Sequence, residues 1–250
     1  EFSLTKVLAD NDILPSVIVG YSLGEITALV VSGVISLEDG LRFSIDSAKL
    51  LEKTGDDGGM LSVLDSDRGL GKHRQLFENC WLAGKNFDGN SVYSGSRNDI
   101  DALQVNLKDR SIATQRLPIN YAFHSPLMDS HKDDILALAK NINYNELSIP
   151  IISAVDSKPI HNISEHHIWD ILSKPVQFSQ TMKILIQQGN SIFVDLGPSG
   201  TLATFVKYLA DKNNQPVVYN TINQFGKNCQ SMDNIIQYLQ KNPPRELVNS

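Results

Sequence analysis

The length, composition and charge of the chain limit the class of protein to which it can belong. Its 250 residues, 41% hydrophobic and 20% charged, can bury one large core, or a large core with a smaller attached subdomain. A net charge of −6 without clustered lysines and arginines argues against nucleic acid as a partner. No apolar run approaches the roughly 20 residues that cross a bilayer, and no secretory signal is recognisable, so we expect a cytoplasmic protein without a membrane segment.

The first part of the sequence shows long helices around one buried strand. Apolar spacing predicts the helices, and an unbroken apolar run predicts a strand buried on both faces, as in a parallel sheet. The expected helices are 2–10, 23–32 and 37–53, and the expected strand is 17–19. Ser36 is a candidate N-cap for the helix 37–53, with Asp39 at the third position as in a capping box.

From residue 58 to residue 119 the pattern changes to shorter elements. The expected strands are 60–64, 81–83, 91–94 and 113–118, and the expected helices are 71–78 and 99–108. Their order, strand–helix–strand–strand–helix–strand, is that of the ferredoxin-like split unit. We therefore predict a ferredoxin-like subdomain at 58–119, inserted into a core domain made of 1–57 and 120–250.

Long helices and buried strands return after residue 120. The expected helices are 126–141, 164–172, 178–188, 201–211 and 232–240, and the expected strands are 149–155, 191–196 and 217–220. Strands that alternate with helices indicate a parallel sheet. The predicted fold class is α/β, with a parallel-sheet, α/β-hydrolase-like core and an inserted ferredoxin-like subdomain.

Residues 20–24, Gly-Tyr-Ser-Leu-Gly, have the G-x-S-x-G spacing between a predicted strand and a predicted helix. Glycines allow a tight strand-to-helix turn, so that the Ser22 hydroxyl projects from a strained corner. The following helix brings its positive dipole end to Ser22 and the backbone N–H of Leu23 to the place of an oxyanion. Ser22 is a candidate nucleophile and Leu23 a candidate oxyanion donor, against the alternative of an ordinary glycine-rich turn.

A serine nucleophile needs a base, usually histidine at neutral pH. His124 lies between the last predicted strand of the subdomain and the next helix, and a cleft commonly forms at such a junction. It is the candidate base, against the alternative of a histidine that caps the following helix. The other histidines lie in polar segments and are expected to be exposed: His73, His131, His161, His166 and His167.

These residues resemble those of a known family, the acyltransferases of fatty-acid and polyketide synthesis, typified by malonyl-CoA:acyl-carrier-protein transacylase. Residues 20–25 are similar to the family's GHSxGE motif, and residues 121–125, Tyr-Ala-Phe-His-Ser, to its HAFHS or YASHS motif. Residues 175–177, Pro-Val-Gln, resemble its NPVQ/W segment, and residues 195–198, Asp-Leu-Gly-Pro, its E-x-GP segment. The motifs follow the family's order, and the resemblance runs over residues 2–240.

The resemblance implies a Ser–His dyad that works through an acyl-enzyme. Ser22 would attack an acyl thioester, and His124 would take its proton and later activate the acceptor. A main-chain carbonyl in the Pro-Val-Gln segment, assigned to Gln177, would orient the histidine. The resemblance implies no cofactor and no metal, since the acyl group arrives on the phosphopantetheine of an acyl carrier protein or on CoA. The implied partners are an acyl carrier protein and its acyl thioester.

Several positions bear on the acyl group that is bound. Tyr21 stands where the family usually has histidine, and Tyr21, Ser47 and Phe123 are predicted to bind substrate. Malonyl-type members carry at the position of Ser47 an arginine that grips the free carboxylate, a pairing that is hard to replace. Arg42 and Lys49 fall on other faces of the same helix. We therefore expect an uncharged acyl group, handled by an acyltransferase or by an acyl-carrier-protein hydrolase, with malonyl transfer as the less favoured alternative.

The family also has a strand and a GQG segment before the nucleophile, which supply a second oxyanion donor. This sequence shows no such segment ahead of Ser22, so we expect that portion on a separate chain or outside the sequence given. Without it, a non-enzymatic scaffold that binds a carrier protein stays open as an alternative.

Two other enzyme classes share part of the pattern. Esterases of the α/β-hydrolase class place their histidine late in the chain, after an acidic partner, whereas His124 is mid-chain. Patatin-like lipases pair G-x-S-x-G with Asp-Gly-Gly, which occurs at 57–59 but is better explained as a helix-ending turn. Both classes are therefore less favoured.

The remaining signals are weaker. His166, His167 and Asp170 could be metal ligands, but adjacent histidines point in different directions on a helix. Neither of the two cysteines, Cys80 and Cys229, has the spacing of a metal site or a disulfide framework. An acidic carrier protein would need a basic landing surface. The candidates for it are Lys72, Arg74, Lys108 and Arg110.

Overall fold

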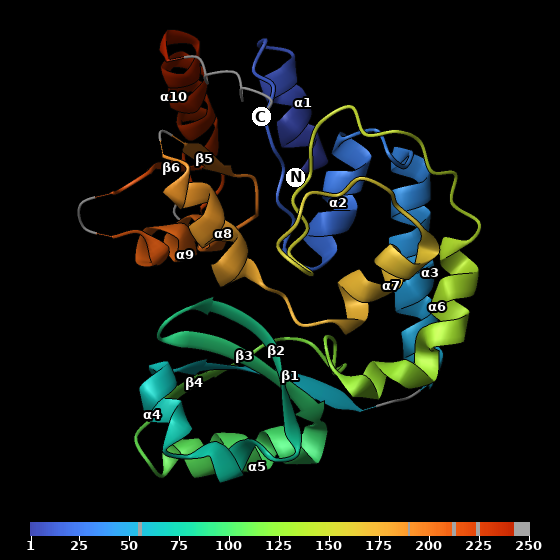
Figure 1. Cartoon of the computed structure of the whole chain (residues 1–250), viewed down its shortest axis with the longest axis vertical. Helices are drawn as coiled ribbons and strands as arrows, with labels where there is room; N and C mark the ends of the chain where they lie inside the picture. Colours follow the sequence, from blue (N-terminus) through green and yellow to red (C-terminus); the bar gives the residue numbers. More distant parts are fainter. Residues whose placement is uncertain (55–56, 190, 212–213, 224–225, 243–250) are drawn as a thin grey trace.

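In a computed structural model, which describes residues 1–54, 57–189, 191–211, 214–223 and 226–242, a small antiparallel sheet lies against a larger part rich in helices (Figure 1). The helices are α1 (Phe2–Ala9), α2 (Leu23–Val31), α3 (Leu37–Thr54), α4 (Asp67–Gly71), α5 (Arg97–Lys108), α6 (Lys132–Ala139), α7 (Glu165–Ser173), α8 (Phe178–Gln187), α9 (Thr201–Leu209) and α10 (Asn228–Lys241), with the 3-10 helices η1 (Arg74–Phe77) and η2 (Pro126–His131). The strands are β1 (Gly58–Leu64), β2 (Cys80–Phe87), β3 (Asn90–Ser96), β4 (Ala113–Arg116), β5 (Ile192–Asp195) and β6 (Val217–Asn220). None of the described helices has the length and apolarity that a membrane span requires.

The small sheet, formed by β1 to β4, has the strand order β2-β3-β1-β4, and all its neighbouring strands are antiparallel. This is the order of the predicted ferredoxin-like unit. On one face, Leu61 and Val63 pack against the apolar side of α5, below the sheet in Figure 1. Side chains alternate along a strand, so Met60 and Ser62 point to the opposite face, toward the rest of the chain. Both faces are therefore buried.

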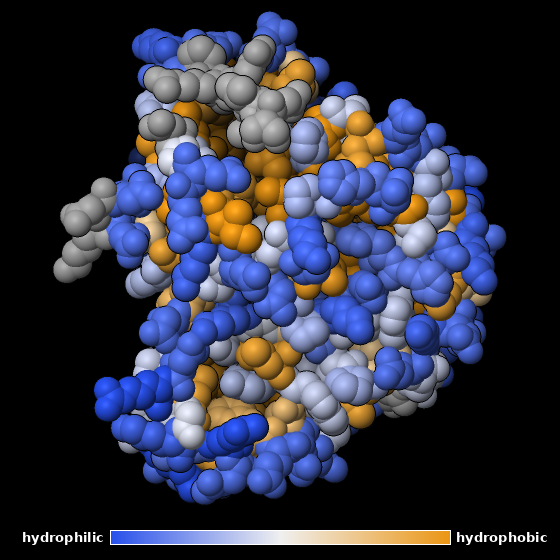
Figure 2. Space-filling view, viewed as in Figure 1, coloured by the Kyte–Doolittle hydropathy of each residue, from blue (hydrophilic) through white to orange (hydrophobic). Residues whose placement is uncertain are grey.

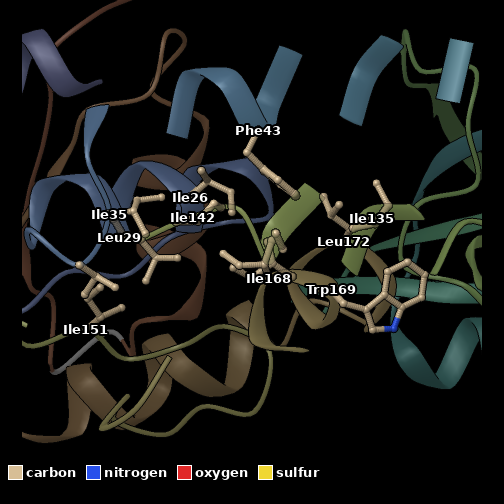
Figure 3. Packing of buried hydrophobic residues seen from close by; sticks show 14 of the residues in the cluster. Ile26, Leu29, Ile35, Phe43, Ile135, Ile142, Ile151, Ile168, Trp169 and Leu172 are labelled. Carbon is tan, nitrogen blue, oxygen red and sulfur yellow. The ribbon is translucent and has the colours of Figure 1, made fainter. Parts of the chain in front are cut away.

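The largest apolar cluster lies among α2, α3, α6 and α7 (Figure 3). Leu29, Ile135, Ile151 and Ile168 have no exposed surface, and burial of each such side chain stabilises the fold by about 1.5–3 kcal/mol. The cluster fixes α2, the helix that begins next to Ser22.

On the face shown in Figure 2, hydrophilic side chains cover most of the surface and apolar ones gather in patches between them.

The predicted parallel core sheet is found only in part. Strands β5 and β6 pair in parallel, with Ile192 opposite Val217. The expected strands 17–19 and 149–155 are wrong as strands, because they meet in a single parallel bridge, Ile18 with Ile151. After Ile152 the chain turns back on itself, and the Ser153 N–H donates to the carbonyl of Lys158 at 2.9 Å. This turn ends the pairing with 17–19.

Most predicted helices lie within a few residues of the observed ones, and the two exceptions have local causes. The helix expected at 71–78 is wrong: α4 begins earlier, where the Ser66 hydroxyl accepts from the N–H of Gly69 at 3.1 Å, and ends at Gly71, and the 3-10 helix η1 follows. The helix expected at 126–141 starts as the 3-10 turn η2 before α6 begins. The predicted cap of α3 is confirmed, since Ser36 accepts from the Asp39 N–H at 2.9 Å.

The two glycines that flank Ser22 have different surroundings. A Cβ placed on Gly20 would lie 2.2 Å from the Cα of Glu25, so only glycine lets the incoming chain pass the first turn of α2. A Cβ on Gly24 would meet only ordinary van der Waals contact, at 3.9 Å from a Glu1 side-chain oxygen. Of the two glycines, only Gly20 is therefore required by a close approach of the backbone.

Replacement of Gly20 by alanine should lower the free energy of unfolding by about 3 kcal/mol, because the added methyl forces the first turn of α2 to move. Gly24→Ala is the matched control and should be neutral or stabilising by roughly 0.5–1 kcal/mol, since alanine favours the helix. Denaturant unfolding of both variants measures the difference. Equal destabilisation by the two substitutions would contradict this account of the turn.

Candidate active site

Ser22 occupies the turn between the extended segment at 17–19 and helix α2. As the N-cap of α2 it has φ 52° and ψ −121°, a conformation that costs a non-glycine residue about 1–3 kcal/mol and persists only where the surroundings hold it. The positive end of the helix dipole lies at this residue. No described residue accepts a hydrogen bond from the Leu23 N–H, so this donor is free to bind an oxyanion at the turn. The Leu23 side chain is 55% exposed.

The structure brings the two candidate residues of the dyad together. The Oγ of Ser22 lies 2.8 Å from the Nε2 of His124, and the Nδ1 of His124 lies 2.8 Å from the backbone carbonyl of Lys174. A carbonyl only accepts, so the ring proton must be on Nδ1, and Nε2 is left to accept from the serine hydroxyl. Both ring nitrogens are thus occupied away from η2, and Ser125, not His124, stands at the N-cap position of η2, so the alternative of a helix-capping His124 is wrong.

The backbone around His124 is as constrained as that around Ser22. His124 has φ 59°, and its N–H donates to the carbonyl of Leu172 at 2.9 Å. Two contacts with the end of α7 and the residues after it, one from the backbone and one from the ring, therefore hold the histidine.

Burial sets the protonation of His124. The residue is 3% exposed, and desolvation lowers its pKa from 6.5 to about 4, although the hydrogen bond to the Lys174 carbonyl partly opposes this shift. The imidazole is therefore neutral near pH 7. A neutral ring with a bare Nε2 is the form that can accept a proton from serine.

The carbonyl that faces His124 corrects the assignment to Gln177. Gln177 is instead the N-cap of α8, with its N–H on the Ala154 carbonyl at 2.6 Å and its own carbonyl accepting from Thr181. Lys174 follows the last turn of α7 and precedes Pro175, so its backbone is extended and its carbonyl is free of the helix. The residue before the proline was therefore the signal that sequence reasoning missed.

Tyr21, the neighbour of Ser22, points toward the small sheet. Its ring packs on Phe178 with centroids 5.5 Å apart, and its hydroxyl donates to the Oδ1 of Asn86 at 2.9 Å. Burial raises the pKa of Tyr21 to about 12, while the bond to Asn86 acts in the opposite direction. The phenol therefore stays protonated as a hydrogen-bond donor.

The other predicted substrate residues are Phe123, which adjoins the dyad in the sequence, and Ser47, which lies on helix α3. Phe123 precedes His124, with ring centroids 6.4 Å apart, and packs on the apolar side of the small sheet. Ser47 lies between Phe43 and Leu51 on the buried face of α3 and is 8% exposed. Its hydroxyl donates to the carbonyl of Ser44 at 3.2 Å. Among the residues that the structure describes, no hydrogen bond joins Ser47 to Ser22 or His124.

Glu25 has a buried carboxyl group that sequence reasoning missed. It is 1% exposed, accepts from the Nε2 of His167 at 2.9 Å and accepts from the Ala154 N–H at 3.1 Å. The expected exposure of His167, and that of His131, which is 4% exposed, is therefore wrong. Within the described ranges no cluster of His, Cys, Asp or Glu could hold a metal ion.

Comparison with known proteins bears on the family of the chain. A family model described as the acyl transferase domain matches residues 1–241. The chain is 36% identical to the polyketide biosynthesis acyltransferase homolog PksD of Bacillus subtilis (strain 168), over 99% of this chain and 76% of that protein. It is 30% identical to the polyketide biosynthesis acyltransferase homolog BaeD of Bacillus velezensis, again over 99% of this chain and 76% of that protein.

A solved structure shows the same fold. The loading acyltransferase from the avermectin modular polyketide synthase superposes with a TM-score of 0.86 at 24% identity, covering 96% of this chain and 77% of that one. The predicted α/β fold class is thereby confirmed, although identity at this level carries no statement about substrate. On the family model and the two Bacillus relatives, the chain belongs to the acyl transferase domain family and is an enzyme of the acyltransferase class.

Proposed function

We propose that the chain moves acyl groups from acyl-carrier-protein thioesters through an acyl-enzyme on Ser22, in polyketide biosynthesis. The observation that carries the proposal is the pair of 2.8 Å contacts from the ring of His124 to the Oγ of Ser22 and to the carbonyl of Lys174. The names of the two Bacillus relatives support the polyketide setting. A carrier protein is the partner that such chemistry implies.

In the first half-reaction, the Oγ of Ser22 forms a bond to the thioester carbonyl carbon while its proton passes to the Nε2 of His124. The Leu23 N–H and the N-terminus of α2 stabilise the negative charge on the carbonyl oxygen. The carbon–sulfur bond then breaks, and His124 returns the proton to the leaving thiol. In the second half-reaction His124 takes a proton from the acceptor, which forms a bond to the ester carbonyl carbon. The bond from that carbon to the Oγ of Ser22 then breaks, and His124 returns the proton to Ser22.

The buried position of Ser47 supports an uncharged acyl group. Where a malonyl-type enzyme holds the free carboxylate with an arginine, this chain has a neutral hydroxyl that already donates to Ser44. A carboxylate bound there would be desolvated without a cation to pair with. The proposed substrates are therefore simple acyl thioesters.

The acyl-enzyme is tested by replacing the dyad. Ser22→Ala should abolish the acyl adduct, and His124→Ala should slow its formation by about 10²–10⁴-fold, the usual contribution of a general base. Intact-protein and peptide mass spectrometry after incubation with acetyl-carrier protein measure the adduct. Ser130→Ala, an exposed serine, and His161→Gln, an exposed histidine, are the matched controls.

An adduct that survives in Ser22→Ala would refute the assignment, and no adduct in the unaltered chain would leave the carrier-binding scaffold. The fate of the acyl group is then read with a second, unloaded carrier protein present. Acyl found on the second carrier supports transfer, and released free acid supports the alternative of an acyl-carrier-protein hydrolase.

The low pKa of His124 predicts that the pH profile of kcat/KM falls at an unusually low pH on its acid side. Because the folded pKa is about 4 instead of 6.5, the ring should stay neutral as the pH falls through 6.5, and activity should be lost only near pH 4. The unfolded chain binds the proton earlier, so the free energy of unfolding also declines over this window. The pH profile of kcat/KM, with circular dichroism as a check that the chain is folded, measures this fall. A midpoint near 6.5 would contradict the proposed burial of the base.

Substrate choice is tested at Ser47. A carrier protein loaded with an uncharged acyl group should acylate Ser22 roughly 30-fold or more faster than one loaded with malonyl. A buried charge without its partner costs at least about 2 kcal/mol. Ser47→Arg should narrow this ratio, whereas Ala48→Arg, on the exposed side of the same helix, should not. Acylation rates with both thioesters measure the effect. Comparable rates in the unaltered chain would show that Ser47 does not select the acyl group.

A further inference from the structure

Tyr21 ties the nucleophile turn to the second strand of the small sheet. Its hydroxyl donates to the Oδ1 of Asn86, the Nδ2 of Asn86 donates to Asn90 at 2.6 Å, and the Nδ2 of Asn90 donates to Ser62 at 3.1 Å. Asn86 is 2% exposed, and Asn90 and Ser62 are also buried. A buried network with each member paired is rigid, because a broken link would leave a polar atom unsatisfied.

The residue before His124 is tied to the neighbouring strand. The carbonyl of Phe123 accepts from the Oγ of Ser94 at 2.5 Å, and Ser94 has no exposed surface. Ser94 lies in β3, which pairs directly with β2. The residues that precede the two members of the dyad are therefore bonded to adjacent strands of one sheet.

The segment that orients His124 is attached to the same sheet. Strand β2 is at the edge of the sheet, and its free side pairs in parallel with Val176. The Val176 N–H donates to the carbonyl of Ala83 at 2.8 Å, and the Lys85 N–H donates to the carbonyl of Val176 at 3.3 Å. Val176 lies two residues after Lys174, whose carbonyl holds the Nδ1 of His124.

We infer that strands β2 and β3 of the small sheet set the separation between Ser22 and His124, with Tyr21, Asn86 and Ser94 as positioning residues. The inference rests on the proposed function of the dyad. Both members have positive φ and cannot hold these positions by local preference. Three attachments to two paired strands supply the missing constraint, and a displacement of about 1 Å between reacting groups can cost about 10²-fold in rate.

The test uses single-turnover acylation, expressed per active site titrated with a serine-directed fluorophosphonate. Tyr21→Phe keeps the ring on Phe178 and removes the donor to Asn86, and Ser94→Ala removes the donor to the Phe123 carbonyl. Each should lower the saturating rate by about 10- to 100-fold while the half-saturating concentration of acyl-carrier protein stays within about twofold. Ser94→Thr, which retains the hydroxyl, should recover most of the rate.

Tyr93→Phe is the matched control, because it removes the same hydroxyl group as Tyr21→Phe. Tyr93 lies in β3, on the face that packs against Phe77. The substitution should leave the rate per site unchanged. A fall in the number of titrated sites at a normal rate per site would mean that Tyr21 and Ser94 only support folding, and a changed half-saturating concentration at a normal rate would place them in substrate binding. Either result overturns the inference. Absence of labelling in the unaltered chain would instead overturn the proposed function.

Discussion

The site depends on one hydrogen bond, between the Oγ of Ser22 and the Nε2 of His124, which joins residues 102 positions apart. Neither residue has a relaxed backbone, so the surrounding fold must hold both. The absence of a Cβ at Gly20 lets the chain pass against α2, and the apolar cluster beneath fixes that helix. On the other side, the carbonyls of Leu172, in α7, and of Lys174, directly after it, hold the backbone N–H and the ring of His124.

Burial of His124 has two opposite effects on the chemistry. Desolvation keeps the ring neutral and able to accept a proton, but it also disfavours the imidazolium that exists while the proton is held. The Lys174 carbonyl offsets part of that cost by accepting from Nδ1, and the negative charge of a nearby oxyanion would offset more. A third acidic residue is therefore not needed to orient the ring.

The features that could be predicted from the sequence are those that short segments encode. Ser22, His124, the strand order of the small sheet and the cap at Ser36 follow from local motifs and periodicity. The contacts of Glu25 with His167 and of Tyr21 with Asn86 join residues 142 and 65 positions apart, so no local pattern predicts them. The carbonyl that orients His124 was predicted at Gln177 and lies at Lys174, three residues earlier. A motif locates a segment of the chain, but it does not show which carbonyl near that segment is free of the preceding helix. The strand expected at 149–155 failed for a similar reason, since its turn depends on pairing with later residues.

The most direct test of the central claim is the protonation of His124 itself. Nitrogen NMR of histidine-labelled protein at about pH 6, below the ordinary histidine pKa, separates the possible states of the ring. The signal is assigned by its loss in His124→Gln, and exposed His161 serves as the internal reference. A neutral ring with its proton on Nδ1 and a bare Nε2 is the predicted result. A charged ring, or a proton on Nε2, would contradict the account.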